Sequence, residues 1–117
     1  MAGGARRCRL SGPAAFETVF RNGLRRDGEY VQLISVKAAH ACGRTGFVIG
    51  RKALPRAVDR NRVRRMLRVA LRQAQPAIAG QDVVVRLKRG APRTEFRLIV
   101  AEAVRLLATL GTQRPAA

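Results

Sequence analysis

The sequence has 117 residues, which is enough for one domain and too short for two domains with separate cores. Lys and Arg total 24 against 7 Asp and Glu, which gives a formal net charge of +17. Because 47% of the residues are hydrophobic, the chain can bury a core and is not a disordered basic tail. The cations are 21 Arg and 3 Lys, and Arg suits bidentate contact with phosphate, so we expect a folded domain that binds a polyanion.

Several other classes of protein are disfavoured by the same sequence. No apolar run approaches the roughly 20 residues that a membrane-spanning helix needs. Residues 1–10 carry positive charge without a following apolar stretch, so no secretory signal is predicted. Cys8 and Cys42 are not closely spaced, and a domain with its own core needs no disulfide. We therefore expect a cytoplasmic protein in a reducing compartment.

The first predicted helix begins at Pro13, because proline suits the first position of a helix. Phe16, Val19 and Phe20 then repeat at helical spacing until Asn22-Gly23 ends the pattern. The sequence thus predicts a short helix with an apolar face.

Two strands are predicted after this helix. Tyr30–Val36 contains β-branched and aromatic residues in alternation, and Gly46–Gly50 is a second short apolar run. The small residues of Ala38–Gly43 connect them. We therefore expect a hairpin, and a short extra strand near Leu24–Asp27 is compatible with the pattern.

The next predicted helix has one continuous apolar face. Its apolar residues fall three and four positions apart, at Val63, Met66, Leu67, Ala70, Leu71 and Ala74. At about 100° per residue, the opposite side receives Asn61, Arg64, Arg65, Arg68 and Arg72. Asp59 is the predicted N-cap, and Pro76–Gly80 is expected to end the helix. The outer face is therefore predicted to consist almost entirely of guanidinium groups.

Asp82–Leu87 is the clearest candidate for a buried strand, because three consecutive valines suit coverage on both faces. Thr94 is predicted to cap a final helix whose apolar spacing runs from Phe96 to Leu110. The order α, β, β, α, β, α, with the extra strand optional, predicts an α+β fold with helices packed on a small, mostly antiparallel sheet. Residues 1–117 are expected to form a single domain with loose ends at 1–5 and 113–117.

Positive charge is most concentrated between Arg51 and Arg72. These 22 residues hold nine cations and one acid, Asp59, so their net charge is 9 − 1 = +8. Like charges four residues apart destabilise a helix by a few tenths of a kcal/mol per pair, so a helix built only for stability would contain Glu among them. A solvated basic face is the simpler alternative, but the missing acids and the preference for Arg favour polyanion binding.

The choice of polyanion follows from the apolar face of the same helix. A basic amphipathic helix can lie on an anionic membrane, but its apolar face must then be free. Here that face is needed to cover the strand that contains Val83–Val85, so RNA or DNA is preferred. Helix-turn-helix, zinc-finger and RNP-type aromatic motifs are absent from the sequence, which leaves recognition of shape and backbone.

The segment Arg60-Asn61-Arg62-Val63-Arg64-Arg65, preceded by Gly50-Arg51-Lys52 and the loop Ala53–Asp59, resembles the RNR signature of the bacterial ribonuclease P protein subunit. Arg7-Cys8-Arg9-Leu10 and the helix after it resemble the basic arm and first helix of that family. Asp82–Gly90 resembles the family's last strand and turn. The resemblance covers most of the chain, and the ordered set of segments is more specific than the RNR triplet alone.

This resemblance implies an RNA-binding subunit of an endoribonuclease that matures the 5′ end of tRNA. Such a protein binds the catalytic RNA and the 5′ leader of precursor tRNA, and the RNA hydrolyses the substrate with Mg²⁺ that the RNA itself binds. A catalytic residue, a metal site or a protein partner is therefore not expected for the protein. The resemblance also implies a left-handed β-α-β crossover through the RNR helix, against the general right-handed rule.

Two sets of binding residues follow from the resemblance. The contacts to the catalytic RNA would be Arg60, Asn61, Arg62, Arg65 and Arg68, with flanking phosphate contacts from Arg51, Lys52, Arg56 and Arg64. The leader would lie in a cleft between the first helix and the sheet, lined by Phe16, Phe20 and Tyr30.

Simpler roles stay open for some of these residues. Phe16 and Phe20 are also compatible with core packing, and Asn61 with a hydrogen bond at the helix start. Val31 and Leu33 are aliphatic where some family members have an aromatic ring. Weaker base stacking is therefore expected in the leader cleft, where each stacked base is worth about 1–3 kcal/mol.

Two other functions are alternatives to an RNA-binding subunit. A structural ribosomal RNA-binding protein would share the size and charge but would need no leader cleft. A self-sufficient nuclease would need catalytic groups, yet His40 lies in a Gly/Ala-rich connection and no Ser, His and Asp set can be assembled with it. His40 and Cys42 form an H-x-C pair that lacks the further ligands of a metal site.

Overall fold

The computed structural model describes residues 12–37, 44–73 and 80–112. Its elements are α2 (Pro13–Asn22), β1 (Leu24–Asp27), β2 (Val31–Lys37), β3 (Thr45–Val48), α3 (Ala57–Gln73), β4 (Gln81–Leu87), the 3₁₀ turn η1 (Arg93–Glu95) and α5 (Phe96–Thr112). This order confirms the predicted α+β fold and the extra strand at Leu24–Asp27. The predicted connection over 38–43 and most of the predicted helix end over 76–80 lie outside the described residues.

The four strands form one sheet in the order β1-β2-β4-β3. β2 pairs antiparallel with β1 and with β4, whereas β3 pairs parallel with β4. The predicted hairpin of Tyr30–Val36 with Gly46–Gly50 is therefore wrong, because β4 lies between these segments. Val83, Val84 and Val85 are all buried, which requires a central strand that is covered on both faces. The apolar surface that β4 buries in this position outweighs the short sequence separation that would favour pairing β2 with β3.

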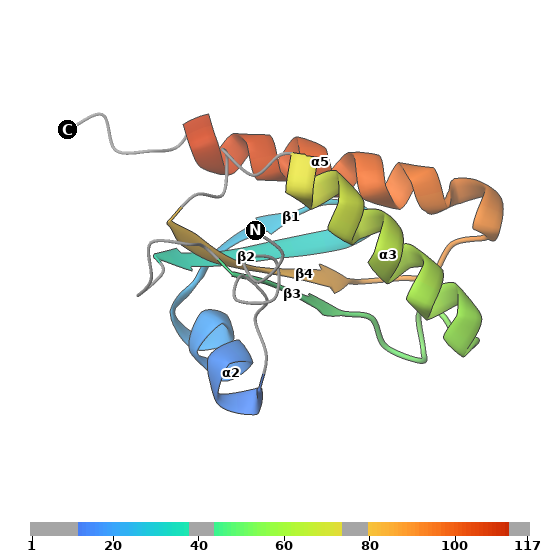
Figure 1. Cartoon of the computed structure of the whole chain (residues 1–117), viewed down its shortest axis with the longest axis horizontal. Helices are drawn as coiled ribbons and strands as arrows, with labels where there is room; N and C mark the ends of the chain where they lie inside the picture. Colours follow the sequence, from blue (N-terminus) through green and yellow to red (C-terminus); the bar gives the residue numbers. More distant parts are fainter. Residues whose placement is uncertain (1–11, 38–43, 74–79, 113–117) are drawn as a thin grey trace, which may run out of the picture.

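Helices cover both faces of the sheet, with α3 and α5 on one face and α2 on the other (Figure 1). The larger core lies under α3 and α5, where Val63, Leu67 and Leu71 of α3 pack with Val83 and Val85. The smaller core joins Val19 of α2 to Ile34 and Val84. The prediction that the apolar face of α3 covers β4 is confirmed.

α3 links two parallel neighbours, β3 and β4, and so forms a β-α-β crossover. The left-handed sense of this crossover stays a prediction. Among the described residues, no helix combines the length and the apolar character that crossing a bilayer requires.

The starts of α3 and α5 differ from the sequence predictions. α3 begins at Ala57, because the Arg56 carbonyl already accepts the backbone N–H groups of Asp59 and Arg60. Asp59 therefore lies in the first turn and not at the N-cap, and its carboxylate accepts a hydrogen bond from Arg93 Nε at 2.8 Å. Thr94 is not a cap either, since it lies inside η1, which leads directly into α5.

Two buried carboxylates hold the sheet to its surroundings. Glu102 of α5 accepts the backbone N–H groups of Glu29, Tyr30 and Val31 at 2.7–2.9 Å, so it fastens the turn between β1 and β2. Asp82 of β4 accepts the Arg44 backbone N–H at 3.0 Å and its guanidinium at 2.8 and 3.2 Å. The Asp82 carboxylate raises the pKa of Arg44 above its ordinary value.

Candidate nucleic-acid interface

Five exposed residues form a stripe along the outward side of α3. Val63, Leu67 and Leu71 face the core, so the opposite side of the helix faces solvent. At about 100° per residue, Arg65 and Val69 lie within about 20° of Val58 around the helix axis, and Arg62 and Arg72 lie within about 40° of Val58. All five residues are exposed. We call Val58, Arg62, Arg65, Val69 and Arg72 the outer stripe.

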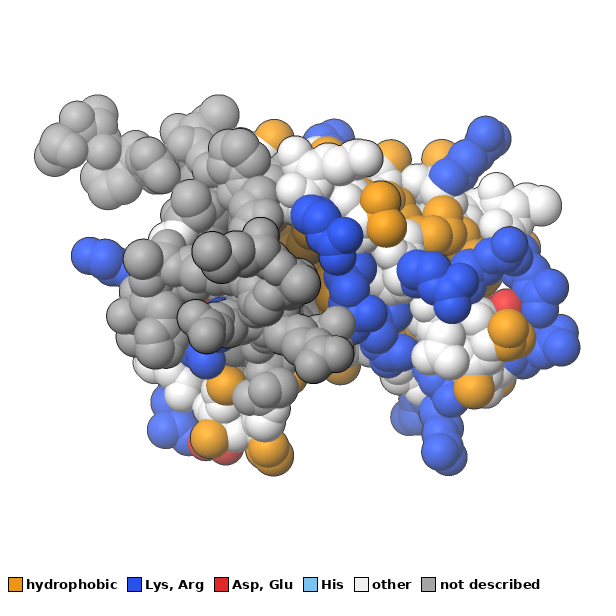
Figure 2. Space-filling model, in the orientation of Figure 1, with side chains coloured by type: hydrophobic (Ala, Val, Ile, Leu, Met, Phe, Trp, Pro, Cys, Tyr) orange, Lys and Arg blue, Asp and Glu red, His pale blue; other side chains and the backbone are white. Residues whose placement is uncertain are grey.

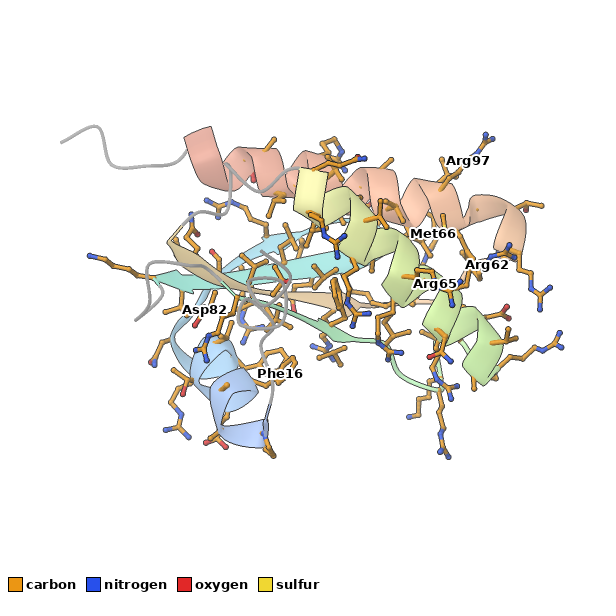
Figure 3. All side chains as sticks on the ribbon, viewed as in Figure 1. Phe16, Arg62, Arg65, Met66, Asp82 and Arg97 are labelled. Atoms are coloured by element: carbon orange, nitrogen blue, oxygen red, sulfur yellow. The ribbon has the colours of Figure 1, made fainter. Side chains whose placement is uncertain are left out.

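The flanks of α3 carry the other predicted contacts. Arg64 and Arg68 are half-buried, and the Arg68 guanidinium lies 5.7 Å from the centre of the Phe47 ring on β3. The sequence had predicted both arginines on the outer side of α3. They lie instead on its flank. Met66 lies on the flank toward α5 and packs against the larger core (Figure 3).

Arg60 is turned toward the protein. Its Nη1 donates to the carbonyl oxygens of Leu54 and Pro55, both at 2.8 Å. The preceding loop is also held from the other side, because Gly90 approaches the Ala53 carbonyl so closely that a β-carbon there would collide with it. Arg60 thus fastens the loop to the start of α3, and its predicted RNA contact stays a prediction.

The remaining predicted contacts are exposed around the start of α3. Arg51, Lys52 and Arg56 lie on the loop, and Asn61 lies on the first turns of the helix, where its Oδ1 accepts from Arg64 Nη1 at 3.0 Å. Figure 2 shows cationic side chains gathered along α3 and its preceding loop with almost no acidic side chain among them. The predicted basic surface is therefore present on this side of the molecule.

The opposite face of the sheet, which we call the α2 face, holds the predicted phenylalanines. Phe16 and Phe20 are half-buried and pack around Val19, Ile34 and Val84. Figure 3 shows Phe16 on this side and Arg62 and Arg65 on the other. The two predicted binding surfaces therefore lie on opposite sides of the sheet.

Arg86 and Arg25 are cations of the α2 face that sequence reasoning missed. Arg86 alternates with the core residues Val85 and Leu87, so it points to the α2 face, where it is exposed. Arg25 donates to the Phe20 carbonyl at 2.8 Å and to Gln32 Oε1 at 3.3 Å, which ties the end of α2 to the sheet. The signal in the sequence was the parity of Arg86 with Val84 within an otherwise apolar strand.

Tyr30 does not join Phe16 and Phe20. It packs against the larger core, its hydroxyl donates to Glu95 Oε1 at 3.0 Å, and the Arg89 guanidinium lies 4.9 Å from its ring centre. The prediction that these three rings line one cleft is therefore not met by the geometry. β2 begins only at Val31, so the alternation of side chains that would place Tyr30 on the same face as Ile34 does not include Tyr30.

Acidic and metal-ligating residues are sparse in the part of the chain that the structure describes. There, no three His, Cys, Asp or Glu side chains come together as they would around a metal ion. His40 and Cys42 lie outside the described residues.

Comparisons with known proteins agree with the sequence resemblance. The profile of the family described as Ribonuclease P matches residues 5–111. The Ribonuclease P protein component of Nitrosococcus oceani is 36% identical over 91 residues, which cover 78% of this chain and 76% of that protein. The fold is similar to that of the RNase P protein of Staphylococcus aureus, with a TM-score of 0.78 at 19% identity over 87% of this chain and 94% of that one. The RNase P protein of Thermotoga maritima gives a TM-score of 0.71 at 24% identity, over 86% and 96% of the two chains. The chain therefore belongs to the ribonuclease P protein family.

Proposed function

We propose that this protein is the RNA-binding subunit of ribonuclease P and that it binds the catalytic RNA through α3 and the loop before it. The observation that carries this proposal is that the two sides of α3 differ. Its apolar side packs in the core, and Arg62, Arg65 and Arg72 lie on the side exposed to solvent. Arginine forms bidentate hydrogen bonds with phosphate oxygens and is well suited to an RNA backbone. Family membership favours this role over that of a structural ribosomal protein.

The proposal assigns the 5′ leader of precursor tRNA to the α2 face. Phe16 and Phe20 offer ring surfaces that a base can stack on, and the exposed Arg86 offers a contact for a leader phosphate. Because this face lies across the sheet from α3, one protein can hold the catalytic RNA and the leader at the same time.

The chemistry is assigned to the RNA. Hydrolysis of the phosphodiester bond needs an activated water and stabilisation of the charge that develops on the phosphate, which Mg²⁺ held by RNA phosphates can supply. The two buried carboxylates of the described residues, Asp82 and Glu102, are already occupied by the hydrogen bonds given above. The protein's part is to bind, orient and neutralise charge.

Reconstitution with a bacterial ribonuclease P RNA tests the proposal. At a Mg²⁺ concentration where the RNA alone is slow, the wild-type protein should accelerate removal of the leader. Arg62→Ala and Arg65→Ala should each weaken assembly with the RNA by about tenfold, the value of one charge-assisted hydrogen bond. Arg21→Ala is the control, because it removes the same charge from the exposed side of α2. Cleavage by the protein without RNA, or equal effects of all three variants, would contradict the proposal.

A further inference from the structure

The outer stripe of α3 is not purely cationic. Val58 is 56% exposed and Val69 is 50% exposed, and both lie close to the centre line of the stripe, with Arg62 and Arg65 between them along the helix. The helix has already completed its core contacts through Val63, Leu67 and Leu71. About half of each valine surface is therefore open to solvent, and neither valine packs against the two described cores.

Stability does not account for this placement. A single exposed valine is common, but valine has a lower helix propensity than the Lys, Glu or Gln that usually fill a solvent-facing position. Two valines 11 residues apart on one stripe are separated by about 16 Å along the helix, and arginines lie between and beside them. An all-phosphate contact would be served better by a cation at each position. The pattern indicates a partner that presents apolar surface and negative charge in alternation.

Resting on the proposed function, we propose that Val58 and Val69 contact the faces of unpaired bases in the catalytic RNA, while Arg62, Arg65 and Arg72 bind the neighbouring phosphates. In a continuous A-form duplex the base faces are stacked and hidden, and a protein meets mainly phosphates and 2′-hydroxyls. In loops and bulges the bases are unstacked, and their faces accept apolar side chains. The surface therefore fits a non-helical segment of folded RNA.

A protein partner fits the charge of this surface less well. It would need carboxylates around an apolar centre, and this chain has only 7 acidic residues against 24 basic ones, so a second copy cannot supply them readily. A nucleic acid supplies a negative charge at every nucleotide.

A salt titration separates the two kinds of contact. Affinity for the ribonuclease P RNA is measured from low to high salt for the wild type, the double variant Val58→Ser/Val69→Ser, and Arg65→Ala. The double variant should lose about tenfold in affinity at every salt concentration, because apolar contacts release no counterions. Arg65→Ala should instead lower the slope of log affinity against log salt by about one.

Matched controls complete the experiment. Leu24→Ser removes an apolar side chain that is 63% exposed on β1, at the sheet edge far from β3, and should leave RNA affinity unchanged. A fully duplex RNA should bind the double variant and the wild type equally, because it hides its base faces. An equal loss on the duplex would assign the valines to ribose and overturn the base contact.

The remaining outcomes each decide one question. Wild-type affinity in the double variant would refute the base contact while leaving the proposed function intact. Failure of the wild-type protein to bind the RNA would refute the proposed function itself. A change in oligomeric state by sedimentation, with RNA affinity unaltered, would assign the valines to a second copy of the chain.

Discussion

Tyr30 shows how neighbouring residues set the behaviour of one side chain. Its hydroxyl donates to Glu95, and this hydrogen bond to a carboxylate raises the pKa of the phenol above its ordinary value of about 10. Partial burial and the charges of Glu95 and Glu29 act in the same direction, while the hydrogen bond with Arg89 acts against them. Tyr30 is thus a link between η1 and the end of β4, and not part of the α2 face.

The phenol titration of Tyr30 can be measured directly, because the sequence contains one tyrosine. Its ultraviolet absorbance should show a pKa above that of free tyrosine, and Glu95→Gln should bring the value back toward about 10. The folded state holds the proton more tightly than the unfolded state. The resulting stability is therefore present below the unfolded pKa and lost as pH rises through the folded one. Glu17→Gln on α2 is the control, and an unshifted wild-type titration would contradict this account.

Glu102 is the residue on which the turn between β1 and β2 depends. Glu102→Ala would leave three backbone N–H groups without their acceptor, that of Val31 buried and those of Glu29 and Tyr30 part-buried, and a buried unsatisfied donor costs about 1–3 kcal/mol. We expect a loss of about 3 kcal/mol or more in the free energy of unfolding, measured by urea denaturation. Glu17→Ala removes an exposed carboxylate and should change stability by less than about 1 kcal/mol. Equal small losses in the two variants would show that solvent replaces Glu102.

At the scale of elements, the loop before α3 depends on a residue that the family resemblance placed among the RNA contacts. Arg60 belongs to the RNR triplet, yet its guanidinium donates to the Leu54 and Pro55 carbonyls. The exposed cations Arg51, Lys52 and Arg56 lie on this same loop. Arg60 therefore holds in place the loop that carries these cations.

Arg60→Ala should release this loop without unfolding the domain. Limited digestion with trypsin should then cut after Arg51, Lys52 or Arg56 at least about tenfold faster, because loss of two hydrogen bonds to a charged donor favours local opening by about 1.5 kcal/mol or more. Arg62→Ala, which removes the same charge from the outer stripe, should leave the digestion rate of the loop unchanged. Matching rates for the two variants would remove the positioning role.

Sequence periodicity predicted the elements well and their partners less well. The apolar spacing of α3 is a local property, so Val63, Leu67 and Leu71 could be assigned to the core from the sequence. The pairing of β4 with both β2 and β3 is a long-range property that no local pattern encodes. The outer stripe differs from the prediction for a local reason: with Asp59 as the predicted N-cap, Val58 lay outside the predicted helix, whereas α3 begins at Ala57.

At the scale of the whole molecule, the sheet separates two surfaces. The basic surface lies on the α3 side and the phenylalanines lie on the α2 side (Figures 1 and 3). The sequence indicated both sets of residues, through the RNR resemblance and the helical spacing of Phe16 and Phe20. It could not show that Tyr30 belongs to the opposite side, because the side on which a residue next to a strand packs depends on where that strand begins.

This separation predicts additive effects of substitutions on the two sides. Phe16→Ala should weaken binding of leader-bearing tRNA by about tenfold relative to mature tRNA, in line with the loss of one stacking platform. Arg65→Ala should weaken assembly with the catalytic RNA and leave that ratio unchanged. In the double variant the free-energy changes should add, because the sites share no partners.

Thermal denaturation of these variants distinguishes the loss of an RNA contact from unfolding of the protein. Phe16 packs on the smaller core, so Phe16→Ala is informative only where the melting temperature shows a folded protein at the assay temperature. Glu17→Ala, at the next position on α2, controls for changes in the helix itself. Equal losses for leader-bearing and mature tRNA would return Phe16 to the core alone.

The insertion of β4 between β2 and β3 also has a consequence for how the chain acquires its shape during synthesis. The strand that joins the sheet together is the last one translated, and α3 is complete before the surface it rests on exists. A nascent chain that ends at Gln73 would leave unpaired the strand edges of β2 and β3 that β4 later joins, and it would expose the aliphatic side of α3. Both features lead to aggregation. The sheet can therefore close only after Gln81–Leu87 has been made, so this strand protects the segments before it from aggregation.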